Sequence, residues 1–347
     1  MGAGTVPQGE AARGEALRAR VEAHLRAATG RPVEVAGVTP LGGGAVQDLL
    51  RVDVAGLDAP RFVLRSDAAR PLPGSIDRRR ELAVIEAARA AGVRTPAARW
   101  PAADLVRPGA TALFLDWVDG EAIGRKVVAS PALAGARTRL IDEVAVELAR
   151  LHTITPASCP ALVAALGAPP PDPLAAQVRA LRGLADALRA ARPAVEVALA
   201  WLGARPAPAP AVLAHGDLRT GNLVVAPEGL VAVLDWEFAR WSAREEDLAW
   251  LCVRDWRFGQ LRLAAGGVAP REALYRAYEA AAGVAVDRAA VRAWEVLGNV
   301  RWALGCLAQG ARYAERPDLE LAAIARRAPE MEWEALRLID LAERGPA

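Results

Sequence analysis

The sequence predicts an α+β protein of two lobes, a small lobe built around a β-sheet and a larger, mostly helical lobe. Residues 33–118 hold extended runs around one helical segment, whereas the chain from residue 133 onward is dominated by helical patterns. The turn-forming pair Asp119-Gly120 separates the two regions. Because 347 residues are enough for two hydrophobic cores, we expect an N-terminal lobe at 1–118 and a C-terminal lobe at 119–347.

The small lobe is expected to open with an amphipathic helix at 9–28, in which Leu17, Val21 and Leu25 recur at helical spacing. Turn-forming residues separate three extended runs that predict an antiparallel meander: Val33–Leu41, Leu49–Val54 and Phe62–Leu64. A second helix at 77–91 and further strands around 103–106 and at 111–118 complete this lobe.

The large lobe is expected to be helical except for one β-hairpin. Its predicted helices cover 140–154, 174–191, 194–203, 245–264, 271–282, 288–312, 317–327 and 331–343. The proline-rich segment 157–173 is expected to be irregular. Two apolar runs, Leu223–Val225 and Leu230–Leu234, flank a Pro227-Glu228-Gly229 turn and form the predicted hairpin.

This hairpin is the chemical centre of the sequence. Asn222 stands just before its first strand, Asp235 follows its second strand, and Asp217 lies in the loop that leads in. Because a hairpin brings its two ends together, an amide oxygen and a carboxylate are expected to converge there. Oxygen ligands beside a further carboxylate suit Mg²⁺ and a bound phosphate.

The segment also has the spacing of a protein-kinase catalytic loop, since Asn222 follows the Asp217 of His215-Gly216-Asp217 by five residues. With Leu234-Asp235-Trp236-Glu237, it resembles the aminoglycoside phosphotransferase and choline kinase-like family. The resemblance implies a protein-kinase-like two-lobed fold and phosphate transfer from ATP or GTP to a small-molecule hydroxyl. Residues 234–239 and 246–250 further resemble a bacterial subgroup, similar to kinase domains associated with acyl-CoA dehydrogenases, which implies hydroxyacyl-type substrates.

The resemblance also implies roles for residues around the hairpin. Asp217 would be the general base or aligning carboxylate, and Asn222 and Asp235 would bind Mg²⁺. His215 and Asp247 would brace the loop. Further candidates are Glu237 as an optional metal ligand, and Arg219 and Thr220 as contacts to substrate or phosphate. Read alone, Asp217 could be a loop-capping residue, Asn222 a turn residue, and Asp247 a first-turn helix acid.

In the small lobe, Gly42, Gly43 and Gly44 occupy the place of a phosphate-covering loop, although three such glycines also suit a plain hairpin turn. Arg65 stands where kinases carry a phosphate-binding lysine, and Glu81 on the next helix would be its partner. Trp117 lies in the segment expected to offer backbone groups to the nucleotide base.

Composition limits the other functional classes. The net charge is +2, with 43 basic and 41 acidic residues, so neither nucleic acid nor an anionic membrane is expected as a partner. No apolar run approaches the roughly 18 residues of a membrane span. The three scattered cysteines indicate buried thiols in a reducing cytoplasm.

The leading hypothesis is therefore a Mg²⁺-dependent small-molecule kinase. Arg65 and the atypical glycine loop keep open a nucleotide-binding pseudokinase with a regulatory role. A kinase acting on aminoglycoside or macrolide antibiotics would use the same chemistry on another substrate. The choice between ATP and GTP and the oligomeric state are left open.

Overall fold

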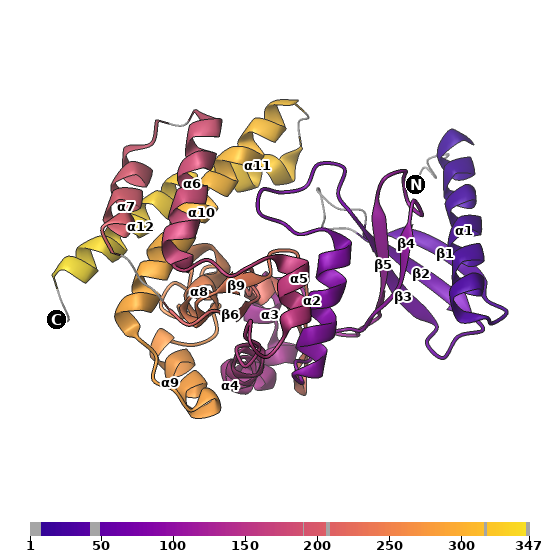
Figure 1. The fold of residues 1–347 in the computed structure, drawn as a ribbon, viewed down its shortest axis with the longest axis horizontal. Helices are drawn as coiled ribbons and strands as arrows, with labels where there is room; N and C mark the ends of the chain where they lie inside the picture. The colour runs from indigo at the N-terminus through magenta and orange to yellow at the C-terminus, as the bar shows by residue number, and fades with distance from the viewer. Residues whose placement is uncertain (1–7, 42–48, 190, 206–208, 316–317, 345–347) are drawn as a thin grey trace. The chain divides into compact units, whose positions relative to one another are not determined.

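The computed structural model describes residues 8–41, 49–189, 191–205, 209–315 and 318–344 (Figure 1). The chain forms two compact units. The first comprises Met1–Glu86 and Pro96–Val118, and the second comprises Ala87–Thr95 and Asp119–Ala347. The short segment Ala87–Thr95 therefore groups with the second unit, and the division into domains at 1–118 and 119–347 stays a prediction.

The first unit contains a five-stranded antiparallel sheet in the order β1-β2-β3-β5-β4. The strands are β1 (Glu34–Pro40), β2 (Leu49–Ala55), β3 (Arg61–Ser66), β4 (Ala98–Ala103) and β5 (Thr111–Asp116). Helix α1 (Gln8–Thr29) lies beside the sheet in Figure 1 and contributes Val21 and Leu25 to a core shared with Phe62 and Leu64. Helix α2 (Arg78–Ala90) follows β3. The predicted meander of the first three strands is confirmed.

Strand β4 lies earlier in the chain than the predicted run around 103–106. It is an edge strand, its register shifts between Arg99 and Ala102, and Trp100 adopts a left-handed φ of 44°. Pro101 interrupts the pattern that normally identifies a strand, because proline has no N–H for the ladder. An edge strand with a bulge tolerates proline, so the prediction of this strand's position was wrong.

The second unit is mostly helical. Its α-helices are α3 (Gly124–Ala129), α4 (Ala134–Leu151), α5 (Pro160–Leu166), α6 (Pro173–Leu188), α7 (Pro193–Gly203), α8 (Arg244–Trp250), α9 (Arg271–Ala282), α10 (Arg288–Glu315), α11 (Leu319–Ala325) and α12 (Ala328–Glu343). Short 3₁₀ turns are η1 (Pro131–Leu133), η2 (Thr220–Asn222) and η3 (Arg254–Arg257). Helix α10 is the centre of this unit, since α6, α7, α8, α11 and α12 all pack against it (Figure 1).

Two antiparallel strand pairs lie among these helices. The predicted hairpin is present as β7 (Leu223–Ala226) and β8 (Gly229–Val233). A second pair joins β6 (Val212–Ala214) to β9 (Arg240–Ser242) and was not predicted. Strands of three residues are too short to show the alternation from which strands are recognised in a sequence.

The helix predicted at 245–264 ends at Trp250. The Arg257 guanidinium donates to the carbonyl of Cys252 at 2.8 Å, which satisfies an acceptor left over where the helix stops. Phe258 and Gly259 then adopt left-handed backbone angles that no α-helix contains. The segment 157–173 also differs from prediction, because it includes helix α5 with Pro160 in its first turn, where proline is well tolerated.

The prediction of buried thiols is confirmed for two of the three cysteines, since Cys159 is only partly buried. All three cysteines are free, and Cys252 and Cys306 are buried. Burial raises the pKa of each of these two thiols to about 12, so neither is a reactive thiolate at neutral pH.

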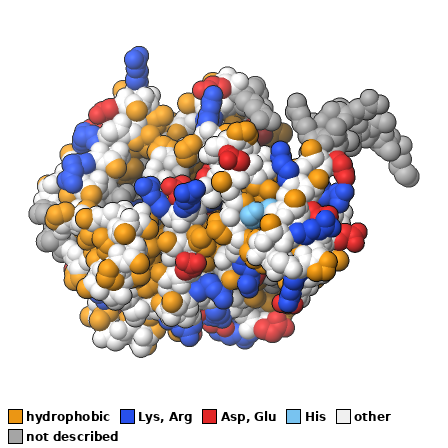
Figure 2. All heavy atoms as spheres, turned by 45° about the vertical axis from the view of Figure 1, so that its right-hand side comes forward, with side chains coloured by type: hydrophobic (Ala, Val, Ile, Leu, Met, Phe, Trp, Pro, Cys, Tyr) orange, Lys and Arg blue, Asp and Glu red, His pale blue; other side chains and the backbone are white. Residues whose placement is uncertain are grey.

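On the surface, basic and acidic side chains are interspersed over the face drawn in Figure 2. Among the described residues, no helix combines the length and apolar character that crossing a membrane requires.

Candidate active site

The loop between β6 and β7 carries most of the predicted site, and Gly216 sets its path. Gly216 has a φ of 74°, and a Cβ at this position would lie 2.3 Å from the carbonyl oxygen of Phe238. Only glycine satisfies both the left-handed backbone and the close approach. The chain therefore turns sharply between His215 and Asp217.

Both carboxylate oxygens of Asp217 accept hydrogen bonds from buried side chains. The indole Nε1 of Trp250 donates to Oδ1 at 2.8 Å, and the amide Nδ2 of Asn222 donates to Oδ2 at 2.8 Å. The Nε of Arg219 lies 3.4 Å from Oδ2. The carboxylate is only 10% exposed, so these contacts fix its orientation while leaving a small accessible surface.

Asn222 connects this carboxylate to the hairpin. Its Nδ2 also donates to the carbonyl of Asp217 at 2.8 Å, and the backbone carbonyl of Asn222 accepts a hydrogen bond from the N–H of Leu234 at 2.8 Å. The two ends of the hairpin are thus joined directly, and Asp235 follows Leu234. Asp235 has a left-handed φ of 68°, an uncommon conformation that often marks a functional position.

These residues fit the donor set of a magnesium ion. Within the described residues, the side-chain oxygen of Asn222 has no hydrogen-bond partner, because both bonds of the amide use Nδ2. Asp235 supplies a carboxylate in the adjoining turn, and hard oxygen ligands are those that Mg²⁺ prefers. No group of three or more His, Cys, Asp or Glu side chains that could hold a metal occurs in the described part of the chain. A magnesium ion here would therefore complete its coordination with waters and phosphate oxygens, as is usual for this ion.

The side chain of Asp247 on helix α8 holds the start of the loop by hydrogen bonds to the loop backbone. Its carboxylate accepts hydrogen bonds from the N–H groups of His215 at 2.8 Å and Gly216 at 2.9 Å, and His152 lies 3.2 Å away. Burial would raise the pKa of the Asp247 carboxyl, but the hydrogen bond and charge of His152 and the hydrogen bond from the His215 backbone lower it overall. Asp247 is therefore a buried carboxylate at neutral pH.

His215 contacts both the loop and the hairpin. Its Nδ1 accepts from the N–H of Asp217 at 3.2 Å, and its Nε2 lies 3.0 Å from the carbonyl of Leu234. These partners fit the neutral tautomer with the proton on Nε2. The ring also packs on Trp236, whose indole donates to the hydroxyl of Thr95. Glu237, the optional metal ligand, is buried, and its role stays a prediction.

Arg219 and Thr220, the predicted contacts to substrate or phosphate, have different surroundings. The Arg219 guanidinium lies over the ring of Trp256, 4.9 Å from its centroid, and is 28% exposed. Thr220 is 1% exposed, and its hydroxyl donates to the carbonyl of Gly266 at 2.7 Å. The Thr220 hydroxyl is thus engaged inside the protein, and of the two only Arg219 reaches the surface beside Asp217.

In the first unit, Arg65 on β3 and Glu81 on α2 form the predicted ion pair at 3.1 Å, and both are buried. Arg78 also pairs with Glu81 and lies 3.5 Å from Asp67. The Arg65–Glu81 pairing is as expected, whereas its contact with a nucleotide stays a prediction. Gly42, Gly43 and Gly44 lie outside the described residues.

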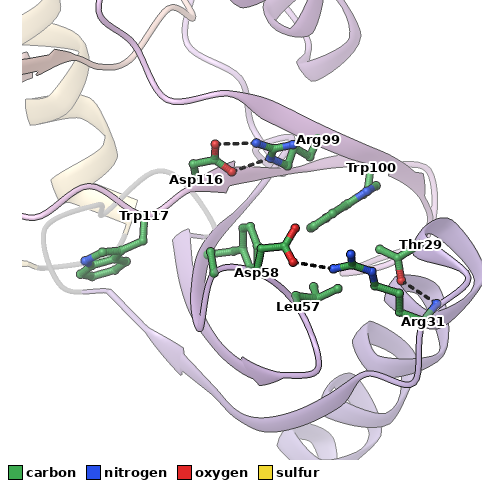
Figure 3. Close-up of a pocket in the computed structure, with 10 residues that line it drawn as sticks. Thr29, Arg31, Leu57, Asp58, Arg99, Trp100, Asp116 and Trp117 are labelled. Carbon is green, nitrogen blue, oxygen red and sulfur yellow. Dashed lines mark hydrogen bonds and ion pairs between the residues drawn. The ribbon is translucent and has the colours of Figure 1, made fainter.

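Trp117 lines a pocket of about 500 Å³ in the first unit. Figure 3 shows the ion pairs Arg99–Asp116 and Arg31–Asp58 in this pocket together with Trp100. Phe62 and Asp116 are direct cross-strand partners, so the pocket opens on the sheet face that carries Phe62. Because successive side chains of a strand alternate, Arg65 belongs to the opposite face. This pocket is therefore separate from any phosphate site at Arg65.

Trp250 was missed as a site residue by sequence reasoning. It lies three residues after Asp247 in helix α8, so both side chains share one helix face. That spacing was visible in the sequence and could have directed attention to Trp250. Arg301, whose guanidinium donates to the carbonyl of Gly216 at 2.6 Å, is 85 residues distant and gave no such signal.

Comparisons with known proteins add family information. The model of the phosphotransferase enzyme family matches residues 37–294. A putative aminoglycoside phosphotransferase from Ralstonia eutropha has a similar structure, with a TM-score of 0.71 and 19% identity over 95% of this chain and 99% of the other.

Two further solved structures are similar. A choline/ethanolamine kinase family protein from Mesorhizobium loti gives a TM-score of 0.56 and 21% identity, covering 95% of this chain and 96% of that one. A spectinomycin phosphotransferase, solved with ADP and spectinomycin, gives a TM-score of 0.61 and 13% identity, covering 93% of this chain and 98% of that one. No curated protein matches the chain. The predicted α+β, kinase-like fold is confirmed.

Proposed function

Because this chain belongs to the phosphotransferase enzyme family and is a small-molecule kinase, we propose that it transfers the γ-phosphoryl group of a nucleoside triphosphate to an alcohol with the help of Mg²⁺. The observation that carries the proposal is the Asp217 carboxylate, hydrogen-bonded through both oxygens and joined by Asn222 to the hairpin that ends at Asp235. A fixed carboxylate beside two oxygen ligands is the arrangement that phosphoryl transfer to a hydroxyl requires.

In this proposal Asp217 accepts a hydrogen bond from the acceptor hydroxyl, orients it, and takes its proton as transfer proceeds. Asn222 keeps the carboxylate in place with its Nδ2, which directs its Oδ1 away from Asp217. Asn222 and Asp235 would hold Mg²⁺. When bound, the ion neutralises charge on the phosphate oxygens. His215 and Asp247 keep the loop in the conformation that presents Asp217.

For the donor, we propose ATP or GTP, with Arg65, Glu81, the backbone at Trp117 and the glycines at 42–44 contributing to its binding. The related spectinomycin phosphotransferase, which was solved with ADP, supports a nucleotide donor. An arginine can bind phosphate oxygens through a bidentate pair of N–H groups, so Arg65 is chemically able to replace a lysine. Its ion pair with Glu81 holds the guanidinium in a defined position.

For the acceptor, the resemblance of residues 234–239 and 246–250 supports a hydroxyacyl-type molecule. Arg219 provides a second argument, since its partly exposed guanidinium lies beside the carboxylate that the hydroxyl must reach. A polycationic aminoglycoside would bring like charge next to this arginine, which favours the hydroxyacyl proposal over an antibiotic kinase. Buried, unreactive thiols fit the proposed cytoplasmic location.

The experiment is a phosphate-release and transfer assay with Mg-ATP and Mg-GTP, first without an acceptor and then with hydroxy acids, hydroxyacyl thioesters and aminoglycosides. We expect slow nucleotide hydrolysis that requires Mg²⁺ and faster turnover with a hydroxyacyl acceptor. Asp217→Asn should lower turnover by about 10²–10⁴-fold, whereas Asp142→Asn, which changes an exposed aspartate on α4, should leave it unchanged. Nucleotide binding without any turnover in the wild type would support the pseudokinase alternative instead.

A further inference from the structure

Helix α8 bonds to the catalytic loop through the side chains of Asp247 and Trp250. Asp247 accepts hydrogen bonds from the N–H groups of His215 and Gly216. One helical turn later, the indole of Trp250 donates to Oδ1 of Asp217. We propose that Trp250 is a positioning residue, which fixes the Asp217 carboxylate in the orientation that phosphoryl transfer requires. This inference rests on the proposed function.

The indole is held rigidly by what surrounds it. Trp250 is 4% exposed, and the Arg301 guanidinium lies 4.3 Å from its ring centroid. The same guanidinium donates to the carbonyl of Gly216, so Arg301 joins the indole to the loop. Burial lowers the pKa of Arg301 to about 10, which leaves it protonated and able to make both contacts at neutral pH.

Helix α10 provides room for the Trp250 ring through a glycine. Gly298 lies on α10, and a Cβ there would come within 3.3 Å of Cε3 of Trp250 and 2.8 Å of the Val253 side chain. Glycine in the middle of a helix costs about 0.5–1 kcal/mol relative to alanine. The close packing of α8 on α10 explains why a glycine at this position is nevertheless favourable.

The Trp250 indole balances the other side chains that bond to the Asp217 carboxylate. Among the described residues, the Asp217 carboxylate contacts the polar side chains of Trp250 on Oδ1 and of Asn222 and Arg219 on Oδ2. Each oxygen has two lone pairs, so an indole on Oδ1 still leaves that oxygen able to accept a substrate hydroxyl. Without the indole, the two remaining partners both attract the carboxylate toward the Oδ2 side. A displacement of about 1 Å in a catalytic group can lower the rate about 100-fold.

The test compares Trp250→Phe with Trp302→Phe. Trp302 is a matched control, because its indole also donates to a carboxylate, Oδ2 of Asp255 at 2.7 Å, and its ring packs against Trp256, as that of Trp250 does. Mg-ATP hydrolysis without acceptor is the readout, together with the Kd for a fluorescent ATP analogue. We expect Trp250→Phe to lower kcat about 10- to 100-fold at unchanged Kd, and Trp302→Phe to change kcat less than about 3-fold.

A double-mutant cycle separates positioning from general stability. If Trp250 acts through the Asp217 carboxylate, adding Trp250→Phe to Asp217→Asn should lower the residual hydrolysis by less than about 3-fold. If Trp250→Phe lowers the hydrolysis rate as much in the Asp217→Asn background as in the wild type, the proposal is overturned. A wild-type kcat in the single variant Trp250→Phe would overturn it as well.

A second variant keeps the test valid if Trp250→Phe does not fold. Gly298→Ala keeps every hydrogen-bonding group and crowds the indole, so we expect a lower kcat at unchanged Kd for the ATP analogue. Equal kcat in Gly298→Ala and the wild type would then count against positioning. Absence of turnover in the wild type, both without and with an acceptor, would instead refute the proposed function, so the two failures are distinguishable.

Discussion

The two parts of the predicted site are stabilised in different ways. In the second unit, the loop from His215 to Asn222 is held by hydrogen bonds that involve its own backbone, with donors or acceptors on Asp247, Arg301 and Asn222. In the first unit, Arg65 is held by an ion pair with Glu81, which Arg78 shares.

Backbone hydrogen bonds restrict a chain to one conformation, whereas buried ion pairs contribute little net stability and depend on complete pairing. From this difference we expect the rate of phosphoryl transfer and the affinity for the nucleotide to respond to different mutations. Changes in the second unit should affect kcat, and changes at Arg65 should affect nucleotide affinity.

The largest effect, after loss of Asp217 itself, is expected from Asp235→Asn. Asparagine tolerates the left-handed φ of 68°, so this variant removes a charge without straining the backbone. Loss of one preorganised charge stabiliser typically lowers kcat about 10²–10³-fold. Hydrolysis measured across a Mg²⁺ titration should show the lower kcat and a higher Mg²⁺ requirement. Wild-type kcat and Mg²⁺ dependence would exclude Asp235 as a metal ligand.

A smaller effect is expected from Arg65. Arg65→Met should weaken binding of Mg-ATP about 10- to 100-fold, since a charge-assisted hydrogen bond contributes about 1.5–3 kcal/mol. Arg65→Lys should retain part of that affinity, because it keeps the charge but loses the bidentate geometry. Isothermal titration with the nucleotide measures both. Exposed Arg80 on the same helix as Glu81 provides the control, as Arg80→Met should bind normally.

The smallest effect is expected on stability. Asp247→Asn removes a buried charge that accepts two backbone hydrogen bonds, and should lower the free energy of unfolding by about 1–3 kcal/mol. Its lowered pKa means that the wild type gains stability from this carboxylate above the unfolded pKa of about 3.9 and loses it as the pH falls through the folded value. Denaturant unfolding at pH 7 and pH 3 should therefore show a smaller difference between variant and wild type at pH 3. An unchanged difference would argue against a charged Asp247.

The sequence alone predicted the parts of the site that lie close together in the chain. Asn222, Asp235 and the hairpin between them follow from local spacing, and the hairpin is present. The meander followed from strand patterns, and the Arg65–Glu81 pair was implied by the position of Arg65 where kinases carry a lysine.

The rest depended on contacts between distant segments. Strands β6 and β9 are too short to recognise separately, and pairing with each other stabilises them. Beyond the end of helix α8, Arg257 bonds to the Cys252 carbonyl and is itself anchored by Glu295 and Glu334, which are distant in the chain. Arg301 reaches the loop only because α10 packs on α8. No local pattern contains this information, since it arises from tertiary packing.

The most direct test is to measure two constants for the Asp217→Asn variant. These are kcat for Mg-nucleotide turnover and Kd for the nucleotide. If the loop in the second unit performs the chemistry, kcat should fall by about 10²–10⁴-fold while Kd stays within about 3-fold of the wild type. Wild-type kcat in this variant would contradict the assignment of Asp217 and with it the central claim.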